Sequence, residues 1–256
     1  MPSYTRHAFS AMDDSDLVLE VVDGRFVDMM RNHDVEYHLK IRKIPFIVVL
    51  NKMDLLMGKA PDFSSMKGEG VPYVPISCAP KRNINRLRTL IFSQLKEGGT
   101  ITVMGYPNTG KSSVINALTG RHAAPTSKQA GFTRGKSKVR LKEDVYIWDT
   151  PGIIPLDEYD QFTLMLFSAK SPNQLKDLEV LAMQLLEWIP AHPFWADWIF
   201  RMYGLVLSGD GEEQLEQLAV HWKKMRKGGF PDLHASSIKL IHDWQSGFTS
   251  ARAKST

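Results

Sequence analysis

The stretch GYPNTGKSSVINALTG (Gly105–Gly120) decides how the rest of the chain is interpreted. Its first eight residues fit the spacing G-x-x-x-x-G-K-[ST]. They follow the apolar run TITVM (residues 100–104) and open a segment with helical apolar spacing. In this strand–loop–helix context, glycines let backbone N–H groups surround phosphate oxygens, and the helix start adds its positive end. The alternative is a chance match in a glycine-rich turn, which the flanking patterns disfavour.

Two side chains of this loop carry most of the expected phosphate chemistry. Lys111 supplies a positive charge for the β- and γ-phosphates, and the Ser112 hydroxyl is an expected ligand of Mg²⁺. The other loop residues predicted to contact a nucleotide are Asn108, Thr109, Gly110 and Ser113.

Downstream, DTPG (Asp149–Gly152) ends the apolar strand pattern DVYIWD. Asp149 is expected to hold Mg²⁺ through water, and the Gly152 N–H to meet the γ-phosphate. Between the two motifs, Thr133 of GFTRG is the expected switch threonine that closes on Mg²⁺ and the γ-phosphate. Thr126 is a rival for this role, and a solvated loop threonine is the alternative.

A base-reading segment comes before the phosphate loop. NKMD (Asn51–Asp54) follows the apolar run IPFIVVL. The Asp54 carboxylate can accept hydrogen bonds from the guanine ring N–H and exocyclic amine, whereas adenine presents the wrong pattern. Lys52 is expected along the base and Asn51 as a brace. In SCA, after VPYVPI, the Ser77 and Cys78 backbone is expected to meet the guanine carbonyl, although Cys78 could instead be a small buried filler.

The base-reading segment preceding the phosphate loop indicates a circularly permuted order. A nucleotide pocket in an open α/β sheet forms at the carboxyl ends of several strands, so only their spatial arrangement matters. Gly98–Gly99 is the expected join between the old termini. Four apolar β-branched runs alternating with helical patterns predict a doubly wound, mostly parallel sheet, with residues 137–142 and 144–149 as an edge hairpin.

After about residue 155 the pattern becomes helical. Helices are predicted over residues 175–189, 212–227 and 231–247, the second with apolar positions through Trp222 and Met225. The predicted organisation is an α/β domain over 1–160 and a small all-helical C-terminal domain over 161–256. The tryptophan-rich stretch is interpreted as helical core rather than as a base-stacking surface. Its aromatic residues are Trp188, Trp195, Trp198, Phe200 and Tyr203.

The bulk composition sets limits on class and location. The chain has 256 residues, 43% of them hydrophobic, a formal charge of +4 and one cysteine, Cys78. One cysteine excludes a disulfide framework and a cysteine-based zinc site, and suits a reducing cytosol. No apolar run is long enough for a membrane span, and the N-terminal acids argue against a transit peptide. The expectation is a soluble cytoplasmic protein without a membrane partner.

The order NKMD, SCA, GYPNTGKSS, threonine, DTPG resembles that of the circularly permuted P-loop GTPases of the YlqF/YawG group, which includes the ribosome biogenesis GTPase A. The resemblance implies a GTP-hydrolysing assembly factor for the large ribosomal subunit. Asp23-Gly24-Arg25 departs from the group's D-A-R-x-P element, and Ala79 stands where lysine is common.

Catalysis is the least specified part of the sequence. Ile153 follows DTPG where many GTPases carry a water-orienting glutamine, so slow intrinsic hydrolysis is expected. The group's N-terminal P-G-H-M segment has no match, which leaves His7 and His122 as weak candidates to orient water; solvated histidines are the alternative. Asn108 resembles the asparagine of potassium-activated relatives, so the expected cofactors are Mg²⁺ and K⁺; an ordinary loop asparagine is the alternative.

Basic stretches suggest contact with ribosomal RNA. Residues 121–142 hold seven Lys or Arg and no acid, and KRNINRLR and WKKMRKGG are further basic clusters. Such stretches suit phosphate backbones, and a solvated basic face is the alternative. A monomer is favoured and no DNA partner is expected. Two rival functions stay open: a GTP-gated switch unrelated to ribosomes, and an adenine-nucleotide enzyme with a misleading NKMD.

Overall fold

The computed structural model describes residues 12–56, 63–120, 137–149 and 159–247. The chain divides into two compact units, Met1–Leu156 and Asp157–Thr256, and each is described by itself.

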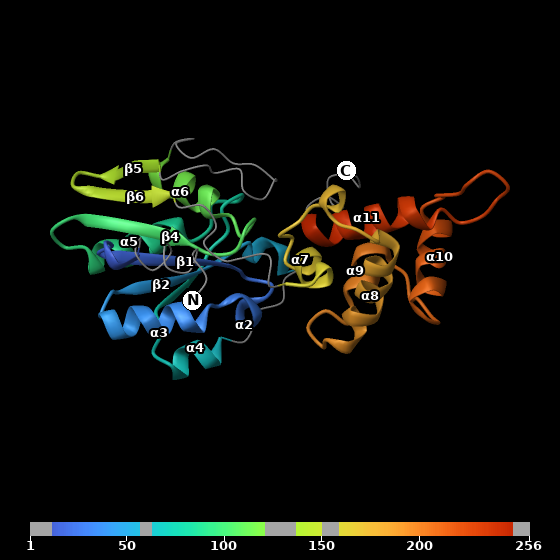
Figure 1. Cartoon of the computed structure of the whole chain (residues 1–256), viewed down its shortest axis with the longest axis horizontal. Helices are drawn as coiled ribbons and strands as arrows, with labels where there is room; N and C mark the ends of the chain where they lie inside the picture. Colours follow the sequence, from blue (N-terminus) through green and yellow to red (C-terminus); the bar gives the residue numbers. More distant parts are fainter. Residues whose placement is uncertain (1–11, 57–62, 121–136, 150–158, 248–256) are drawn as a thin grey trace. The chain divides into compact units, whose positions relative to one another are not determined.

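The first unit is built on one six-stranded sheet with the spatial order β3-β2-β1-β4-β6-β5 (Figure 1). Neighbouring strands are parallel except β5 and β6, which form an antiparallel hairpin at one edge. This confirms the predicted α/β fold with a mostly parallel sheet. The strands are β1 (Leu17–Asp23), β2 (Phe46–Asn51), β3 (Tyr73–Pro75), β4 (Gly99–Met104), β5 (Ser137–Lys142) and β6 (Val145–Asp149).

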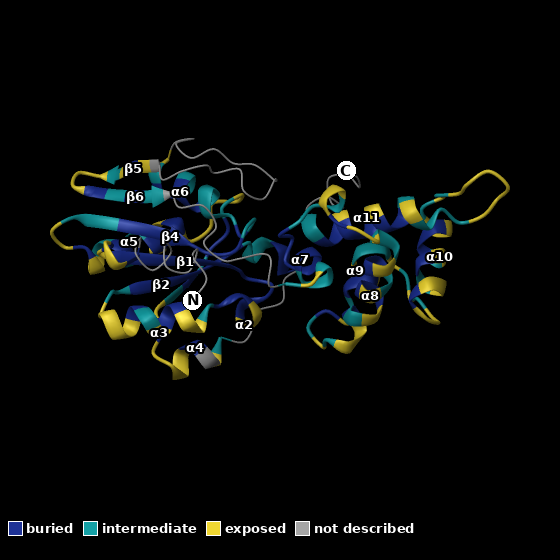
Figure 2. Cartoon of the chain, in the orientation of Figure 1, coloured by how far each residue is buried: buried dark blue, intermediate teal, exposed yellow. Residues whose placement is uncertain are grey.

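Helices are interspersed with these strands and allow both faces of the central strands to be buried. β1 and β2 are buried at every residue, as Figure 2 shows, which explains their continuous apolar sequence. The core on one face contains Leu87 and Ile91 of α5 with Val114 and Leu118 of α6. The helices are α2 (Val27–Met30), α3 (His33–Arg42), η1 (Met53–Leu56), α4 (Ser64–Gly68), α5 (Ile84–Gln94) and α6 (Lys111–Thr119).

The join between α5 and β4 is tight and needs glycine at both positions. Gly98 and Gly99 have φ angles of 98° and 142°, which disfavour side chains. A Cβ on Gly98 would lie 2.7 Å from the Asp144 carbonyl oxygen, and one on Gly99 would lie 2.8 Å from Asp16 Oδ2. The Asp16 carboxylate accepts from the Thr100 N–H at 2.7 Å. The Gly98–Gly99 join predicted from the sequence therefore leads directly into strand β4.

The permuted strand order creates a switch point between β1 and β4. From β1 the chain builds the sheet towards β3, whereas from β4 it builds the other half towards β6 and β5. The carboxyl ends of the parallel strands meet at one edge. In open α/β sheets, ligands bind at this edge, where the winding direction reverses.

A buried group of charged residues lies beside β1. Arg31 donates to both Glu36 oxygens, at 2.8 and 2.7 Å, and forms a salt bridge with Glu69. Glu20 accepts from the Asn32 N–H at 2.7 Å. Burial raises the pKa of Glu20 to about 8, and the nearby Glu36 carboxylate adds to this, against the Asn32 hydrogen bond and the Arg31 charge. Glu20 is therefore protonated at neutral pH.

The second unit is all helical, with an aromatic core around Trp244. The rings of Trp188, Trp195 and Trp198 meet Trp244 edge-on at 5.8, 5.1 and 5.2 Å. The buried Trp244 indole donates to the Leu166 carbonyl at 3.1 Å. The elements are α7 (Gln161–Leu166), η2 (Pro172–Gln174), α8 (Leu178–Ala191), α9 (Trp198–Tyr203), α10 (Gly211–His221) and α11 (Leu233–Ser246).

Two details of the helical prediction are wrong. The helix predicted through residue 227 ends at His221, because Lys223 is left-handed at φ 55° and Met225 pairs with Pro231 in an isolated bridge. Phe200 is 59% exposed, so it is not part of the aromatic core. Met225 fits the helical spacing, but the chain leaves the helix after His221 and turns back at Gly228–Gly229, where Met225 pairs with Pro231.

None of the helices in the described ranges combines the length and apolar character needed to cross a bilayer.

Candidate functional site

The loop between β4 and α6 forms the centre of the site. Gly105 has φ 142°, and a Cβ there would lie 2.1 Å from the Val21 carbonyl oxygen of β1. Asn108 is left-handed at φ 60°, and Gly110, at φ 95°, precedes α6. The close approach to β1 and the positive φ angles explain the glycine spacing. The loop therefore lies at the switch point between β1 and β4.

Polar groups of the loop are fixed by its own backbone. Lys111 Nζ donates to the carbonyl oxygens of Gly105 and Tyr106, at 3.0 and 2.8 Å. The buried Thr109 hydroxyl donates to the Tyr106 carbonyl at 3.0 Å. Ser112 and Ser113 stand in the first turn of α6, both half-buried. The ammonium group and the start of the helix are therefore at one end of the loop.

Asn51, at the end of β2, joins the predicted base-reading segment to this loop. Its Nδ2 donates to the Thr109 carbonyl oxygen at 2.9 Å, across 58 residues of sequence, and the side chain is 2% exposed. A Cβ on Gly110 would lie 2.3 Å from the same Nδ2. Glycine at 110 is thus required by Asn51 as well as by its own backbone. The two segments that the sequence predicted to meet are in direct contact.

Lys52 belongs to an ion-pair network with Asp23 and Arg25. The Asp23 carboxylate accepts from Lys52 Nζ at 2.9 Å and from Arg25 Nη2 at 2.8 Å. Burial by itself would raise the pKa of Asp23, but Arg25 and Lys52 outweigh it and hold the pKa below its usual range. Burial lowers the pKa of Lys52, and Asp23 opposes this. Asp23 therefore positions the Lys52 side chain.

The sequence singled out Asp23 and Arg25 only through a family element, and gave neither a role. Gly24 between them explains the departure from that element. A Cβ on Gly24 would lie 2.6 Å from Met53 Sδ and 2.9 Å from the Asn51 carbonyl oxygen. The Gly24 N–H donates to that oxygen at 2.7 Å. Glycine thus lets β1 and the NKMD segment approach closely.

Asp54 and Cys78 bring the two base-reading segments together. Asp54 lies in η1, whose Met53 N–H donates to the Ile76 carbonyl at 3.2 Å. Burial raises the pKa of the Cys78 thiol to about 12, and the Asp54 carboxylate adds to the shift. Ser77 is buried and pairs with Arg82, which closes a tight turn. Asp54 is therefore electrostatically coupled to the SCA turn.

Several predicted site residues lie outside the described ranges: His7, His122, Thr126, Thr133 and Gly152. The Asp149 backbone ends β6 beside Val103 of β4, and its side chain is not described.

A family model described as "50S ribosome-binding GTPase" matches residues 100–188, which include the phosphate-binding loop. Two solved structures share the fold. A GDP-bound YlqF has a TM-score of 0.65 at 21% identity, over 94% of this chain and 95% of that one. A GNP-bound YlqF from T. maritima has a TM-score of 0.61 at 22% identity, over 94% and 93%.

Curated relatives match nearly the whole chain. The "Uncharacterized GTP-binding protein MJ1464" of Methanocaldococcus jannaschii is 32% identical over 92% of this chain and 63% of its own length. The "GTPase grn1" of Schizosaccharomyces pombe is 27% identical over 96% and 60%. The "Nuclear GTP-binding protein NUG1" of Saccharomyces cerevisiae is 24% identical over 96% and 55%. The chain thus spans less than two thirds of these relatives' length.

Proposed function

We propose that the chain belongs to the YlqF-like group of circularly permuted GTPases, that it binds and hydrolyses GTP, and that it acts in assembly of the large ribosomal subunit. The observation that carries this proposal is the 2.9 Å hydrogen bond from Asn51 Nδ2 to the Thr109 carbonyl. It fixes the end of the base-reading segment beside the phosphate-binding loop, so one nucleotide can span both.

The loop residues supply the phosphate side of the proposed site. Backbone N–H groups from Asn108 to Ser113 and the start of α6 bind the phosphate oxygens. The Lys111 ammonium, which donates to the Gly105 and Tyr106 carbonyls, would move onto the β- and γ-phosphates when a nucleotide binds. A larger residue at 105 or 110 would clash with the Val21 carbonyl oxygen or with Asn51 Nδ2 and so displace the loop from β1 or from the NKMD segment.

Asp54 supplies the guanine specificity. Its carboxylate accepts from the ring N–H and the exocyclic amine, and Lys52, oriented by Asp23, lies along the base. The backbone of the Ser77 and Cys78 turn, coupled to Asp54, donates to the guanine carbonyl. Adenine would leave these groups unpaired.

We propose that a magnesium ion binds at the phosphate end of the site. The Ser112 hydroxyl lies in the first turn of α6, next to Lys111. Ser112, Thr133 and Asp149 offer oxygen ligands of the kind that hard divalent cations prefer. When bound, Mg²⁺ would neutralise the negative charge on the β- and γ-phosphates.

We expect a slow intrinsic rate, since Ile153 cannot orient water. His7 and His122 stay candidates for that task. Asn108 is proposed to hold K⁺ against the phosphates, where another protein would offer an arginine. GTP hydrolysis measured in K⁺ and in Na⁺ should be faster in K⁺; equal rates would remove the potassium site while leaving the GTPase intact.

The ribosomal part of the proposal rests on the description of the matching family model and on the basic stretches, which suit rRNA. Co-sedimentation with large-subunit particles should be stronger with a non-hydrolysable GTP analogue than with GDP. Lys111→Ala, which removes the phosphate-binding ammonium, should abolish this difference. A protein that binds GTP yet never co-sediments would instead be a GTP-gated switch unrelated to ribosomes.

A further inference from the structure

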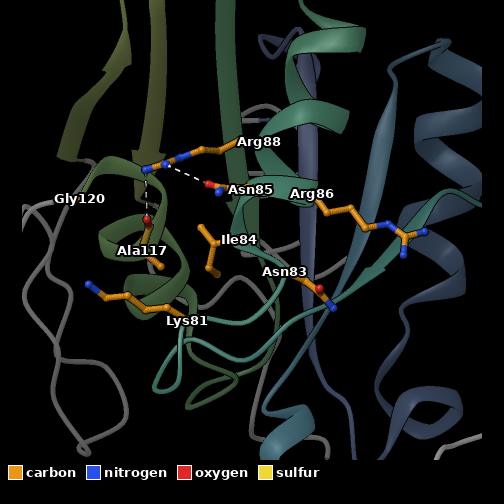
Figure 3. A pocket seen from close by; sticks show the side chains of 8 residues that line it. All are labelled: Lys81, Asn83, Ile84, Asn85, Arg86, Arg88, Ala117 and Gly120. Atoms are coloured by element: carbon orange, nitrogen blue, oxygen red, sulfur yellow. Dashed lines mark hydrogen bonds between the residues drawn. The ribbon is translucent and has the colours of Figure 1, made fainter.

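A basic cavity lies beside the start of α5. Its volume is about 520 Å³, and Figure 3 shows its lining side chains coming from the turn before α5, from α5 itself and from the end of α6. Five of the eight lining residues carry side-chain N–H donors, and none is acidic. The lining residues are Lys81, Asn83, Ile84, Asn85, Arg86, Arg88, Ala117 and Gly120.

The cations around this cavity are available to a ligand. Lys81, Arg82 and Arg86 are exposed, and within the described ranges no carboxylate forms a salt bridge with any of them. The segment from residue 79 to residue 94 has no acidic residue. Because positively charged side chains without anionic partners make the local electrostatic potential positive, this surface attracts anions.

One wall of the cavity is held rigid by Arg88. Its guanidinium donates to the Leu118 carbonyl through Nε at 3.1 Å, and to the Ala117 carbonyl at 3.4 Å. It thereby satisfies carbonyl groups at the C-terminal end of α6 and binds α5 to α6. Arg88 therefore shapes the cavity. The side chain of Arg86, on α5, and that of Lys81, in the preceding turn, extend in different directions (Figure 3).

We propose that this cavity binds phosphate groups of an RNA backbone. Spread-out cations with asparagine amides between them match a chain of phosphates and ribose hydroxyls. A protein partner would need an apolar centre, but the larger exposed apolar side chains of this unit, Met29, Tyr37 and Ile41, lie on α2 and α3. The charge and the polar lining favour nucleic acid over an acidic protein.

The inference rests on the proposed function only for the identity of the polyanion. The cavity and the proposed guanine site share one turn, in which the Lys81 N–H donates to the Cys78 carbonyl at 3.3 Å. RNA binding and nucleotide binding can nevertheless be measured separately, so failure of one does not imply failure of the other.

The test compares two charge-matched double variants of the full chain. Lys81→Glu/Arg86→Glu reverses two cavity charges. Lys67→Glu/Lys96→Glu reverses two exposed charges elsewhere on the same unit, in α4 and after α5. Binding of a labelled ribosomal RNA fragment is titrated at several salt concentrations, with the circular dichroism spectrum and thermal unfolding midpoint of each variant measured to verify folding. If the first variant fails to fold, Lys81→Gln/Arg86→Gln replaces it.

The cavity variant should weaken RNA binding at least about tenfold. The slope of log K against log[salt], where K is the association constant, should become less steep by about 1–2. The control should change affinity less than about threefold. Equal losses in both variants, or no loss in the cavity variant, would overturn the proposal. So would a poly-glutamate peptide that competes for the cavity as well as RNA does, which would indicate an acidic protein partner.

Discussion

Gly110→Ala tests the contact between the base-reading segment and the phosphate-binding loop without any nucleotide. The added Cβ would lie 2.3 Å from Asn51 Nδ2, so the Asn51 side chain must leave the Thr109 carbonyl. Gly120→Ala is the matched control: it caps the other end of α6 at φ 69°, and a Cβ there meets nothing within 4 Å. The two variants share backbone strain and differ in the clash.

The expected costs follow from these two terms. Alanine in a left-handed conformation costs about 1–2 kcal/mol, which is the whole cost of Gly120→Ala. Losing the Asn51 hydrogen bond leaves the Thr109 carbonyl unsatisfied and adds about 1–3 kcal/mol to Gly110→Ala. In an Asn51→Ala background this second term has already been lost. The cost of Gly110→Ala should therefore fall there to that of Gly120→Ala.

The assay must read the first unit alone, because the chain divides into two compact units and two-state unfolding of the whole chain cannot be assumed. Hydrogen exchange of peptides from β1, β2 and β4 in increasing urea gives the free energy of unfolding of this sheet. The measured quantity is the coupling energy between Gly110→Ala and Asn51→Ala, expected at about 1–3 kcal/mol. Additive costs, or equal costs for the two glycine variants, would refute the contact.

Three further predictions concern charge. Asp23→Asn leaves Lys52 without its buried partner and should lower the free energy of unfolding by about 3 kcal/mol at pH 7. Since folding lowers the pKa of Asp23, this loss should shrink as the pH falls below about 4. The same exchange assay measures both effects. Glu20 has a folded pKa of about 8 against an ordinary 4.5, so its protonated form adds stability that is lost as the pH rises between these values. Glu20→Gln, which keeps a neutral side chain beside Glu36, should remove that loss, about 1 kcal/mol per pH unit, and an unchanged pH profile would contradict it. Cys78, the chain's one cysteine, has a pKa of about 12 and should react with iodoacetamide at pH 8 at least about a hundredfold more slowly than glutathione; comparable rates would show a thiolate.

The sequence predicted the centre of the sheet well because β1 and β2 are buried on both faces and appear as unbroken apolar runs. The loop at Gly105–Ser112 was equally predictable, because its glycines have φ angles and close contacts that only glycine allows. The permuted order followed from the position of NKMD before that loop. The strands, the loop and the NKMD segment can each be recognised from residues close together in sequence.

Contacts between distant residues could not be predicted in the same way. Nothing near Asp23 indicates that Lys52, 29 residues later, completes its charge balance. The end of α10 was missed because Trp222 and Met225 keep the helical spacing after the helix has ended. Periodicity cannot distinguish another helical turn from a chain that folds back, and here the bridge from Met225 to Pro231 decides the outcome.

The central claim is that Asp54 and Lys111 serve one guanosine nucleotide, and Asp54→Asn tests it most directly. Xanthine carries a carbonyl where guanine carries its exocyclic amine, so an amide donor at residue 54 should prefer xanthine. We predict that the variant binds GDP at least about tenfold more weakly than the unaltered protein and binds xanthosine diphosphate more tightly. Unchanged GDP affinity with no gain for the xanthine nucleotide would contradict the account.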